Sequence, residues 1–207
     1  MTRSAFKKAY LFLGLLLPVV FCYLLITFIS TAPAVDAEKG SIPSYGKGPQ
    51  EVYIFSDYFC PPCQALEPKL EPVLEELYAK GSVKITFVDT PMHRETPLFA
   101  KFYLYAAATA PDYRAAVRAR QVLFALAVKE NVFWMDERIE ETFQKEKIAY
   151  TAFDVHTVQP ELNRLISQYR IDATPSCVIL SPGAKARKYT GAGDILKGLA
   201  TVRAGVK

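Results

Sequence analysis

The chain has 207 residues, of which 51% are hydrophobic and 22% charged, and its formal net charge is +4 at pH 7. This apolar content is enough for a folded core, which excludes a disordered chain, and the length allows one domain of ordinary size or one domain with an insertion. Basic residues such as Arg114, Arg118 and Arg120 are mixed with acidic ones at helical spacing, so we expect solvated helix faces and no nucleic-acid partner.

An uncharged apolar segment, Ala9 to Ser30, follows three basic residues near the N-terminus. Its 22 residues are enough to cross a bilayer, and the preceding charges predict a cytoplasmic N-terminus. A cleaved signal peptide is the alternative, because Ala32-Pro33-Ala34 has the pattern of a processing site. We therefore predict that residues 1–34 are a membrane anchor or signal segment, with the anchor preferred. The domain would then face the periplasm or cell exterior, either as a single-pass protein of the inner (cell) membrane or as a soluble periplasmic protein.

Residues 35–50 contain three glycines and two prolines and have no apolar period. This composition predicts a linker between the N-terminal segment and the domain. Beyond the membrane, disulfides can form and persist.

A strand–helix–strand unit follows the linker. Residues 52–56 read as a buried strand, a helix begins at the cysteines and ends at Gly81, and residues 83–87 alternate as a half-buried strand does. Pro68 and Pro72 lie inside the helix and predict a kink. A helical crossover between two strands implies that they pair in parallel.

A helical period continues from about residue 96 to residue 170. Thr96, Asp136 and Thr157 are candidate N-caps of three of these helices. We predict a helical insertion at about 96–170 within a domain that spans residues 51–205.

The sheet is predicted to resume with Cys177–Leu180, followed by a turn and a strand at Arg187–Thr190. A last helix is expected over Ile195–Val202.

The motif Cys60-Pro61-Pro62-Cys63 lies at the turn from the first strand to its helix. Two thiols at this spacing can form a disulfide, and a helix start can stabilise a thiolate on the first of them. Half of a zinc site is the alternative, but the two histidines and Cys177 show no ligand spacing. The motif therefore predicts a redox pair, with no metal and no cofactor.

The segment Phe55 to Cys63, together with Ala173 to Ile179, resembles the DsbA-like branch of the thioredoxin superfamily. The resemblance covers about Glu51 to Ala200 and includes the helical insertion. Pro68 matches the kink proline of thioredoxin-type active-site helices. The resemblance implies an α/β, thioredoxin-like fold, here preceded by an N-terminal transmembrane or signal helix, and a thiol-disulfide oxidoreductase.

The resemblance also implies roles for four residues. Cys60 would be an exposed nucleophile at the helix N-cap, and Cys63 a shielded thiol that resolves the mixed disulfide. Pro175 would follow a cis peptide bond beside the sulfurs, and Thr174 would offer backbone groups to an extended substrate.

Two departures from the family bear on the direction of the reaction. Pro62 replaces a histidine that many oxidants of this branch carry, and Pro61 and Pro62 both lack an N–H for the sulfur. A less stabilised Cys60 thiolate makes a weaker oxidant, so we expect a more reducing or intermediate potential than that of a dedicated oxidant.

Three further residues have open roles. Ile54 occupies the position where thioredoxin-type enzymes often keep a buried carboxylate, so that proton relay is missing. Asp57 either places a charge near the sulfurs or caps the turn before the helix. Cys177 either approaches the active site or, as preferred, is a small buried core residue.

These features predict thiol-disulfide exchange on extracytoplasmic proteins, with oxidation, reduction and isomerisation all open. The expected partners are protein or peptide thiols and disulfides, a membrane redox protein that resets the disulfide, and the membrane itself. The alternatives are a Cu(I)-handling protein that uses the same thiols and a non-catalytic thioredoxin-like binding module.

Overall fold

The computed structural model describes residues 40–129 and 132–205. All described residues belong to a single compact unit. The predicted anchor or signal segment, residues 1–34, therefore lies outside the described residues. Within the described part of the chain, no helix is long and apolar enough to span a bilayer.

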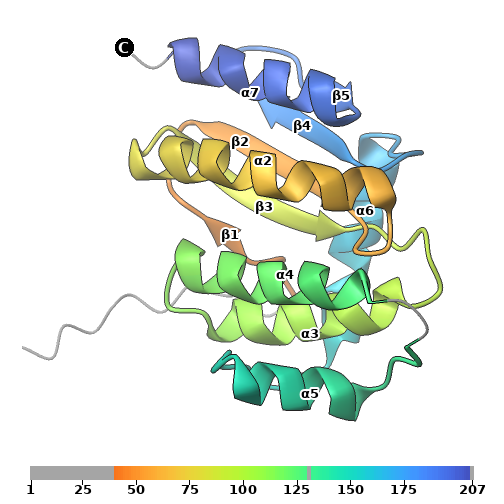
Figure 1. Cartoon of the computed structure of the whole chain (residues 1–207). Coiled ribbons are helices and arrows are strands. Elements are labelled where there is room, and N and C mark those ends of the chain that lie inside the picture. Colours follow the sequence, from red (N-terminus) through yellow and green to blue (C-terminus); the bar gives the residue numbers. More distant parts are fainter. Residues whose placement is uncertain (1–39, 130–131, 206–207) are drawn as a thin grey trace, which may run out of the picture. The chain divides into compact units, whose positions relative to one another are not determined.

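A five-stranded sheet forms the centre of the domain, and helices cover both of its faces (Figure 1). The strands are β1 (Ser44–Tyr45), β2 (Gln50–Ser56), β3 (Val83–Asp89), β4 (Ser176–Leu180) and β5 (Arg187–Thr190). The helices are α2 (Pro61–Ala79), α3 (Thr96–Thr109), α4 (Tyr113–Ala127), α5 (Asp136–Lys145), the 3-10 helix η1 (Val155–Thr157), α6 (Gln159–Gln168) and α7 (Ala192–Gly205). The strand order is β1-β3-β2-β4-β5, in which β2 and β3 are parallel and the other neighbours antiparallel. The predicted parallel strand–helix–strand unit is confirmed.

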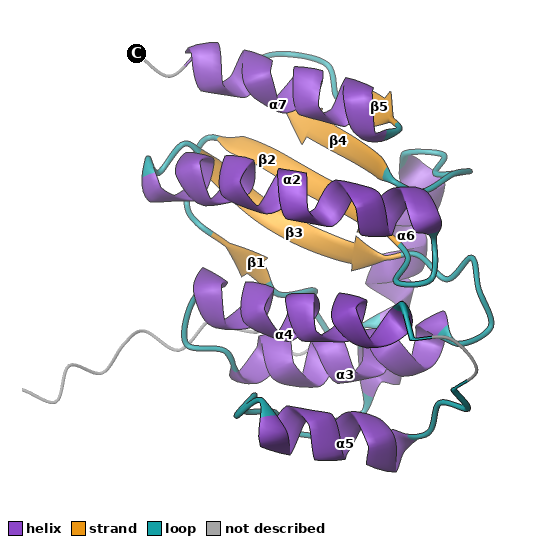
Figure 2. Cartoon of the chain, viewed as in Figure 1, coloured by secondary structure: helices purple, strands orange, loops and turns teal. Residues whose placement is uncertain are grey.

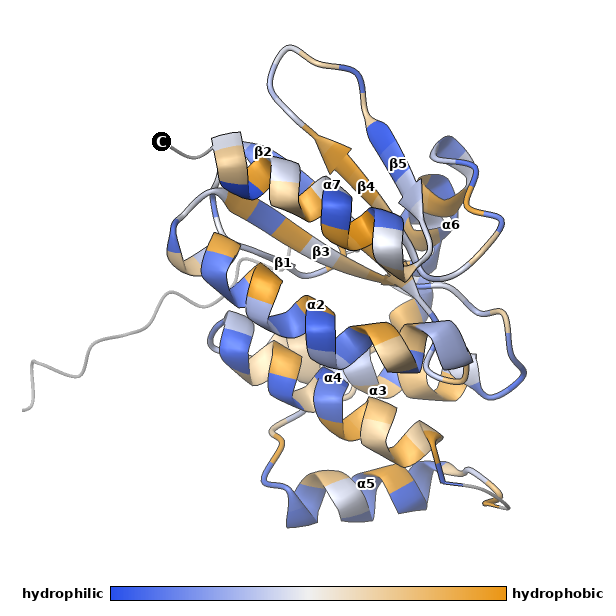
Figure 3. Ribbon diagram, turned by 45° about the horizontal axis from the view of Figure 1, so that its top comes forward, coloured by the Kyte–Doolittle hydropathy of each residue, from blue (hydrophilic) through white to orange (hydrophobic). Residues whose placement is uncertain are grey.

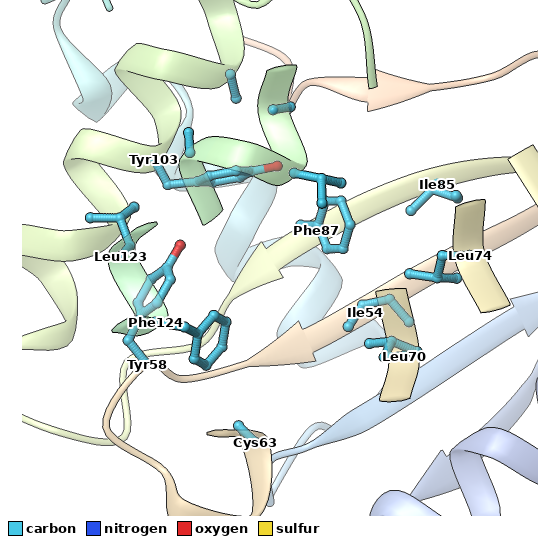
Figure 4. Close-up of a cluster of buried hydrophobic side chains, with 14 of the residues drawn as sticks. Ile54, Tyr58, Cys63, Leu70, Leu74, Ile85, Phe87, Tyr103, Leu123 and Phe124 are labelled. Carbon is cyan, nitrogen blue, oxygen red and sulfur yellow. The ribbon is translucent and has the colours of Figure 1, made fainter. Parts of the chain in front are cut away.

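Apolar side chains form one cluster on each face of the sheet. The larger cluster joins the sheet to α2 and α7 and continues into α3, α4 and α5. Figure 4 shows part of it, with Ile54 and Phe87 of the central strands near Leu70 of α2. The smaller cluster packs Phe55 and Val178, on the opposite face, against α6. Strand β4 is mostly hydrophobic and the edge strand β5 mostly hydrophilic (Figure 3), as expected where a sheet ends in solvent.

The second half of the predicted linker is part of the domain instead, which corrects the 35–50 boundary. Strand β1 pairs antiparallel with β3, and Tyr45 is only 3% exposed. Gly46 has a φ of +88°, and a Cβ there would lie 2.3 Å from the carbonyl oxygen of Val83. A Cβ at Gly48 would lie 2.0 Å from the backbone nitrogen of Val83. These glycines permit a tight turn against the start of β3 and do not mark a flexible segment.

The predicted helices are present in the insertion, but the three proposed caps are wrong. The N-cap residues of α3, α5 and α6 are Glu95, Met135 and Val158, and none of them makes a side-chain capping bond. Thr96 lies one residue inside α3, and its hydroxyl donates to Asp57 instead, 2.7 Å away.

Arg120 corrects the expectation that the basic residues of this region lie on solvated helix faces. Its side chain is fully buried, although it belongs to α4 of the insertion. Its guanidinium forms an ion pair with Glu67 of α2 at 2.7 Å and donates to Ser56 of β2 at 2.6 Å. It also lies 3.5 Å from Asp89 of β3. One side chain therefore connects the insertion to the helix of the cysteines and to both central strands.

Replacing Arg120 with alanine is expected to lower the free energy of unfolding by about 3 to 5 kcal/mol, because Glu67 and Asp89 would be left without a buried counter-charge. Arg118 is the matched control on the same helix. It pairs with Glu146 but is 53% exposed, so Arg118→Ala should cost less than about 1 kcal/mol. Urea unfolding of the full chain measures both, and similar losses for the two variants would contradict the role given to Arg120.

Asp89 makes stability depend on pH. Burial raises the pKa of Asp89 to about 6, although Arg120 and a hydrogen bond from the Tyr58 hydroxyl lower it. Because the folded pKa lies above the unfolded one, the folded protein holds this proton more tightly, and the carboxyl destabilises the fold as pH rises from about 4 to 6.

The variant Asp89→Asn lacks this titration. The stability of the parent relative to Asp89→Asn should therefore fall between pH 4 and pH 7, by on the order of 1 to 3 kcal/mol. Urea unfolding of both proteins across this range gives the difference, in which all other titrations cancel. A difference that does not change with pH would show that Asp89 titrates normally.

Candidate active site

Three loops meet at one edge of the sheet (Figure 2). Strands β2 and β3 are parallel, so the loops after them emerge at the same edge, and β4 is antiparallel to β2, so the loop before β4 lies there too. The cross-strand pairs Ser56 with Asp89 and Phe55 with Ser176 fix this register. The edge therefore brings together the cysteine motif, the β3–α3 loop and the segment before β4.

The two cysteines lie at the start of α2. Cys60 is the N-cap residue, and Pro61 and Pro62 are the first two helical residues, where a missing N–H has no consequence for the helix. Both cysteines are free thiols, and Cys63 lies at one end of the apolar cluster in Figure 4. Cys60 is only 7% exposed and Cys63 2%. The expectation of an exposed Cys60 is therefore wrong in degree, because the segment before β4 packs against its sulfur while the two prolines face solvent.

The helix offers no hydrogen bond to the sulfur of Cys60. The first helical N–H groups, those of Cys63 and Gln64, both donate to the backbone oxygen of Cys60, at 2.9 and 3.0 Å. The Cys60 side chain accepts no capping bond, and its thiol instead donates to the carbonyl oxygen of Thr174, 3.4 Å away.

Cys63 is held in its protonated form. Burial raises the pKa of its thiol to about 12, and the neighbouring Cys60 thiol also raises it, while a backbone group of Asp57 lowers it. The arrangement gives one sulfur at the mouth of the site and one behind it.

The segment before β4 carries the cis peptide bond that the resemblance implied, between Thr174 and Pro175. Pro175 is buried and Thr174 half-buried. The carbonyl of Pro175 accepts a hydrogen bond from Gly191, and the Ser176 hydroxyl donates to Ala173. These bonds hold the carbonyl of Thr174 toward Cys60.

Asp57 joins the cysteine turn to the β3–α3 loop. Its carboxylate is fully buried and accepts hydrogen bonds from the backbone N–H groups of Phe59, Met92 and His93 and from the Thr96 hydroxyl, at 2.7 to 3.0 Å. Burial alone would raise its pKa, but these bonds outweigh burial and lower it. Asp57 therefore caps the turn, as one prediction held, and it also brings a stable negative charge into the site.

His93, in the β3–α3 loop, also belongs to the site, although the sequence suggested only a possible metal-ligand role for it. Its Nδ1 lies 3.0 Å from Oδ1 of Asp57, and its ring centroid is 6.4 Å from that of Phe59, the residue before Cys60. Only the register of β2 and β3 places these residues together, and the sequence carries no signal for it.

Ile54 and Cys177 do not contribute polar chemistry at this edge. They are partners across β2 and β4, deep in the main cluster, and are 1% and 0% exposed. The preferred prediction of Cys177 as a core residue is confirmed. Among residues 40–129 and 132–205, no group of three or more potential ligands is placed to hold a metal ion.

Several solved structures share this fold at low sequence identity. The catalytic domain of Proteus mirabilis ScsC matches with a TM-score of 0.58 and 20% identity, over 84% of this chain and 93% of that one. A periplasmic thioredoxin-like protein from Salmonella enterica serovar Typhimurium matches with the same score and identity, over 86% of this chain and 97% of that one. The thiol-disulfide exchange protein alpha-DsbA2 from Wolbachia pipientis has a TM-score of 0.55 and 18% identity, over 80% of this chain and 85% of that one.

No curated protein sequence matches the chain. The family model described as thioredoxin matches residues 45–181, which is more than half of the sequence and includes the cysteine motif, the insertion and the cis proline. The chain therefore belongs to the thioredoxin family and has the fold of its DsbA-like members.

Proposed function

We propose that the protein catalyses thiol-disulfide exchange on extracytoplasmic protein substrates, with Cys60 as the nucleophile and Cys63 as the resolving thiol. The observation that carries this proposal is the pair of free thiols at the N-terminus of α2, with the outer sulfur 3.4 Å from the carbonyl of Thr174. Three solved proteins of the same fold support it: the ScsC catalytic domain, a periplasmic thioredoxin-like protein and a thiol-disulfide exchange protein.

The exchange would proceed in two steps. Cys60 attacks a substrate disulfide as a thiolate, so that a bond forms between Cys60 and one substrate sulfur while the other substrate sulfur leaves. Cys63 then attacks Cys60, which releases the substrate thiol and closes the internal disulfide. The reverse sequence oxidises a substrate dithiol. The low exposure of Cys63 favours this division of roles, because a large substrate reaches Cys60 first.

Substrate binding is assigned to the backbone of Thr174. An extended substrate chain can pair with main-chain groups beside the cis proline, as a strand pairs with a sheet edge. The carbonyl of Thr174 already faces the sulfur of Cys60, so a substrate held there would place its own sulfur close to the nucleophile. We further propose that residues 1–34 deliver the domain across the membrane, and that a membrane redox protein resets the disulfide.

Changing Cys63 to alanine should trap the first step. The full chain carrying Cys63→Ala is expected to accumulate mixed disulfides with unfolded, disulfide-containing substrate proteins, because the resolving thiol is gone. Non-reducing gels followed by mass spectrometry would locate the bond at Cys60. Cys60→Ala is the matched control and should trap little, since Cys63 is buried. Absence of trapping, together with absence of insulin reduction by the parent, would point to a binding module without exchange activity.

The direction of exchange can be read from the equilibrium with glutathione. Because the helix supplies no N–H to the sulfur of Cys60, we expect a reduction potential well below the value of about −120 mV of a strongly oxidising DsbA. Pro62→His should raise the potential, since it restores an N–H and a side chain that can stabilise a thiolate. Pro182→Ala, which changes an exposed proline in the turn between β4 and β5, should leave it nearly unchanged. A parent value near −120 mV would overturn the reducing assignment but not the exchange activity.

A further inference from the structure

We propose that His93 exchanges a proton with the substrate sulfur during attack at Cys60, an inference that rests on the exchange function proposed above. The histidine that many oxidants carry between the cysteines is replaced by Pro62. The structure places another histidine beside the same turn, on the β3–α3 loop.

The imidazole of His93 is oriented for proton transfer. Asp57 is a carboxylate that only accepts hydrogen bonds, so the nitrogen 3.0 Å away, Nδ1, carries the proton and donates. In the neutral ring Nε2 is then the acceptor. Asp57 is itself fixed, because the backbone N–H groups of Phe59, Met92 and His93 and the Thr96 hydroxyl all bond to its two oxygens. A buried carboxylate that holds Nδ1 leaves Nε2 free for a substrate.

The ring also lies where a substrate can reach it. The side chain of His93 is 42% exposed, whereas its partner Asp57 is fully buried. Its ring is tilted by 45° to that of Phe59, the residue before the nucleophile, with the centroids 6.4 Å apart. The neighbouring Met92 is 44% exposed. The sulfur of Cys60 therefore has the carbonyl of Thr174 beside it. The residue before Cys60 is Phe59, whose ring contacts that of His93.

Charged groups of two segments surround the imidazole. Asp57 approaches the ring from the cysteine turn, with its Oδ1 3.0 Å from Nδ1. Arg94 and Glu95, the next two residues of the loop, are both exposed to solvent and carry opposite charges. The other titratable groups of the turn are Tyr58, whose hydroxyl donates to Asp89, and the thiols of Cys60 and Cys63.

The proton balances in both directions. When a substrate thiol attacks the oxidised site, its proton moves to Nε2, a bond forms between the substrate sulfur and Cys60, and the Cys60–Cys63 bond breaks. Cys63 leaves as a thiolate and then takes a proton from solvent, because its pKa is raised. In the reverse direction Cys63 first loses that proton to solvent and then attacks Cys60, while Nε2 returns its proton to the departing substrate sulfur. No electrons are needed beyond those of the exchange. Since a proton-transfer group lowers the barrier in both directions, it changes rates and leaves the equilibrium between enzyme and substrate unchanged.

Stopped-flow measurement of the attack of reduced glutathione on the oxidised full chain, from pH 5.5 to 8.5, tests the proposal. His93→Gln should lower the second-order rate constant by about tenfold or more and remove one ionisation from its pH profile. The equilibrium constant with glutathione should stay within about twofold of the parent. The chain has only two histidines, so His156→Gln, at an exposed position in η1, is the matched control and should change neither quantity. In His93→Ala, added imidazole should restore part of the rate, which a purely structural role would not allow.

Two results would overturn the inference. An unchanged rate in His93→Gln would show that the imidazole takes no part. A rate and an equilibrium constant that shift together would show that His93 acts on thiolate stability instead of on proton transfer. In both cases the parent still exchanges with glutathione, so the proposed function stands. If the parent itself does not react with glutathione, both the proposed function and the role of His93 fail.

Discussion

The buried guanidinium of Arg120 is the constraint on which the arrangement of the domain depends. A charge removed from water needs counter-charges and hydrogen bonds, and here they come from three elements that are distant in sequence. Glu67 of α2 and Ser56 of β2 accept hydrogen bonds from the guanidinium, and Asp89 of β3 adds a counter-charge 3.5 Å away. The rings of Phe87 and Phe124 lie against it, with centroids 4.6 and 4.8 Å away. Moving the insertion away from the sheet would separate Arg120 from Glu67 and Asp89. Helix α4 is therefore held in a fixed position against α2 and the central strands.

This constraint shapes the charge around the cysteines. Glu67 lies one turn after Cys63 on α2 and is matched by Arg120, whereas the carboxylate of Asp57 is balanced only by hydrogen bonds and by His93. A nearby negative charge disfavours a second one on sulfur. The lowered pKa of Asp57 keeps it ionised at neutral pH, and the two prolines withhold N–H groups from the sulfur of Cys60. Within the pair, Cys63 is the thiol that the site keeps protonated, because burial raises its pKa to about 12.

The sequence predicted the parts of the fold that depend on local pattern. The strand–helix–strand unit, the helical insertion and the redox motif follow from apolar periodicity and from the spacing of Cys60 and Cys63, and the cis bond before Pro175 followed from the family resemblance. Arg120 was misassigned because charge was read without its helical position, although it lies one turn from the buried Ala116 and Phe124. Strand β1 was missed because two residues show no period. The contact of His93 with Asp57 joins residues 36 positions apart and depends on strand register, which no short motif encodes.

The surroundings of Cys60 also bear on which substrates the site can accept. Thr174 offers a main-chain carbonyl, which is the same for every substrate sequence and so carries no side-chain preference. Two accessible apolar groups lie at the cysteine turn: Phe59, which precedes the nucleophile, and Met92, whose backbone N–H donates to Asp57. A methionine adapts to partners of different shape. Asp57 is buried and engaged, so it offers no charge to a substrate. The exposed Arg94 and Glu95 of the β3–α3 loop carry opposite charges and so favour no single substrate charge. If substrates bind as proposed, the site selects for an accessible cysteine in an extended segment more than for a sequence. Such a preference suits an enzyme that meets proteins before their folding is complete, since folded proteins seldom present a disulfide in an extended, accessible chain.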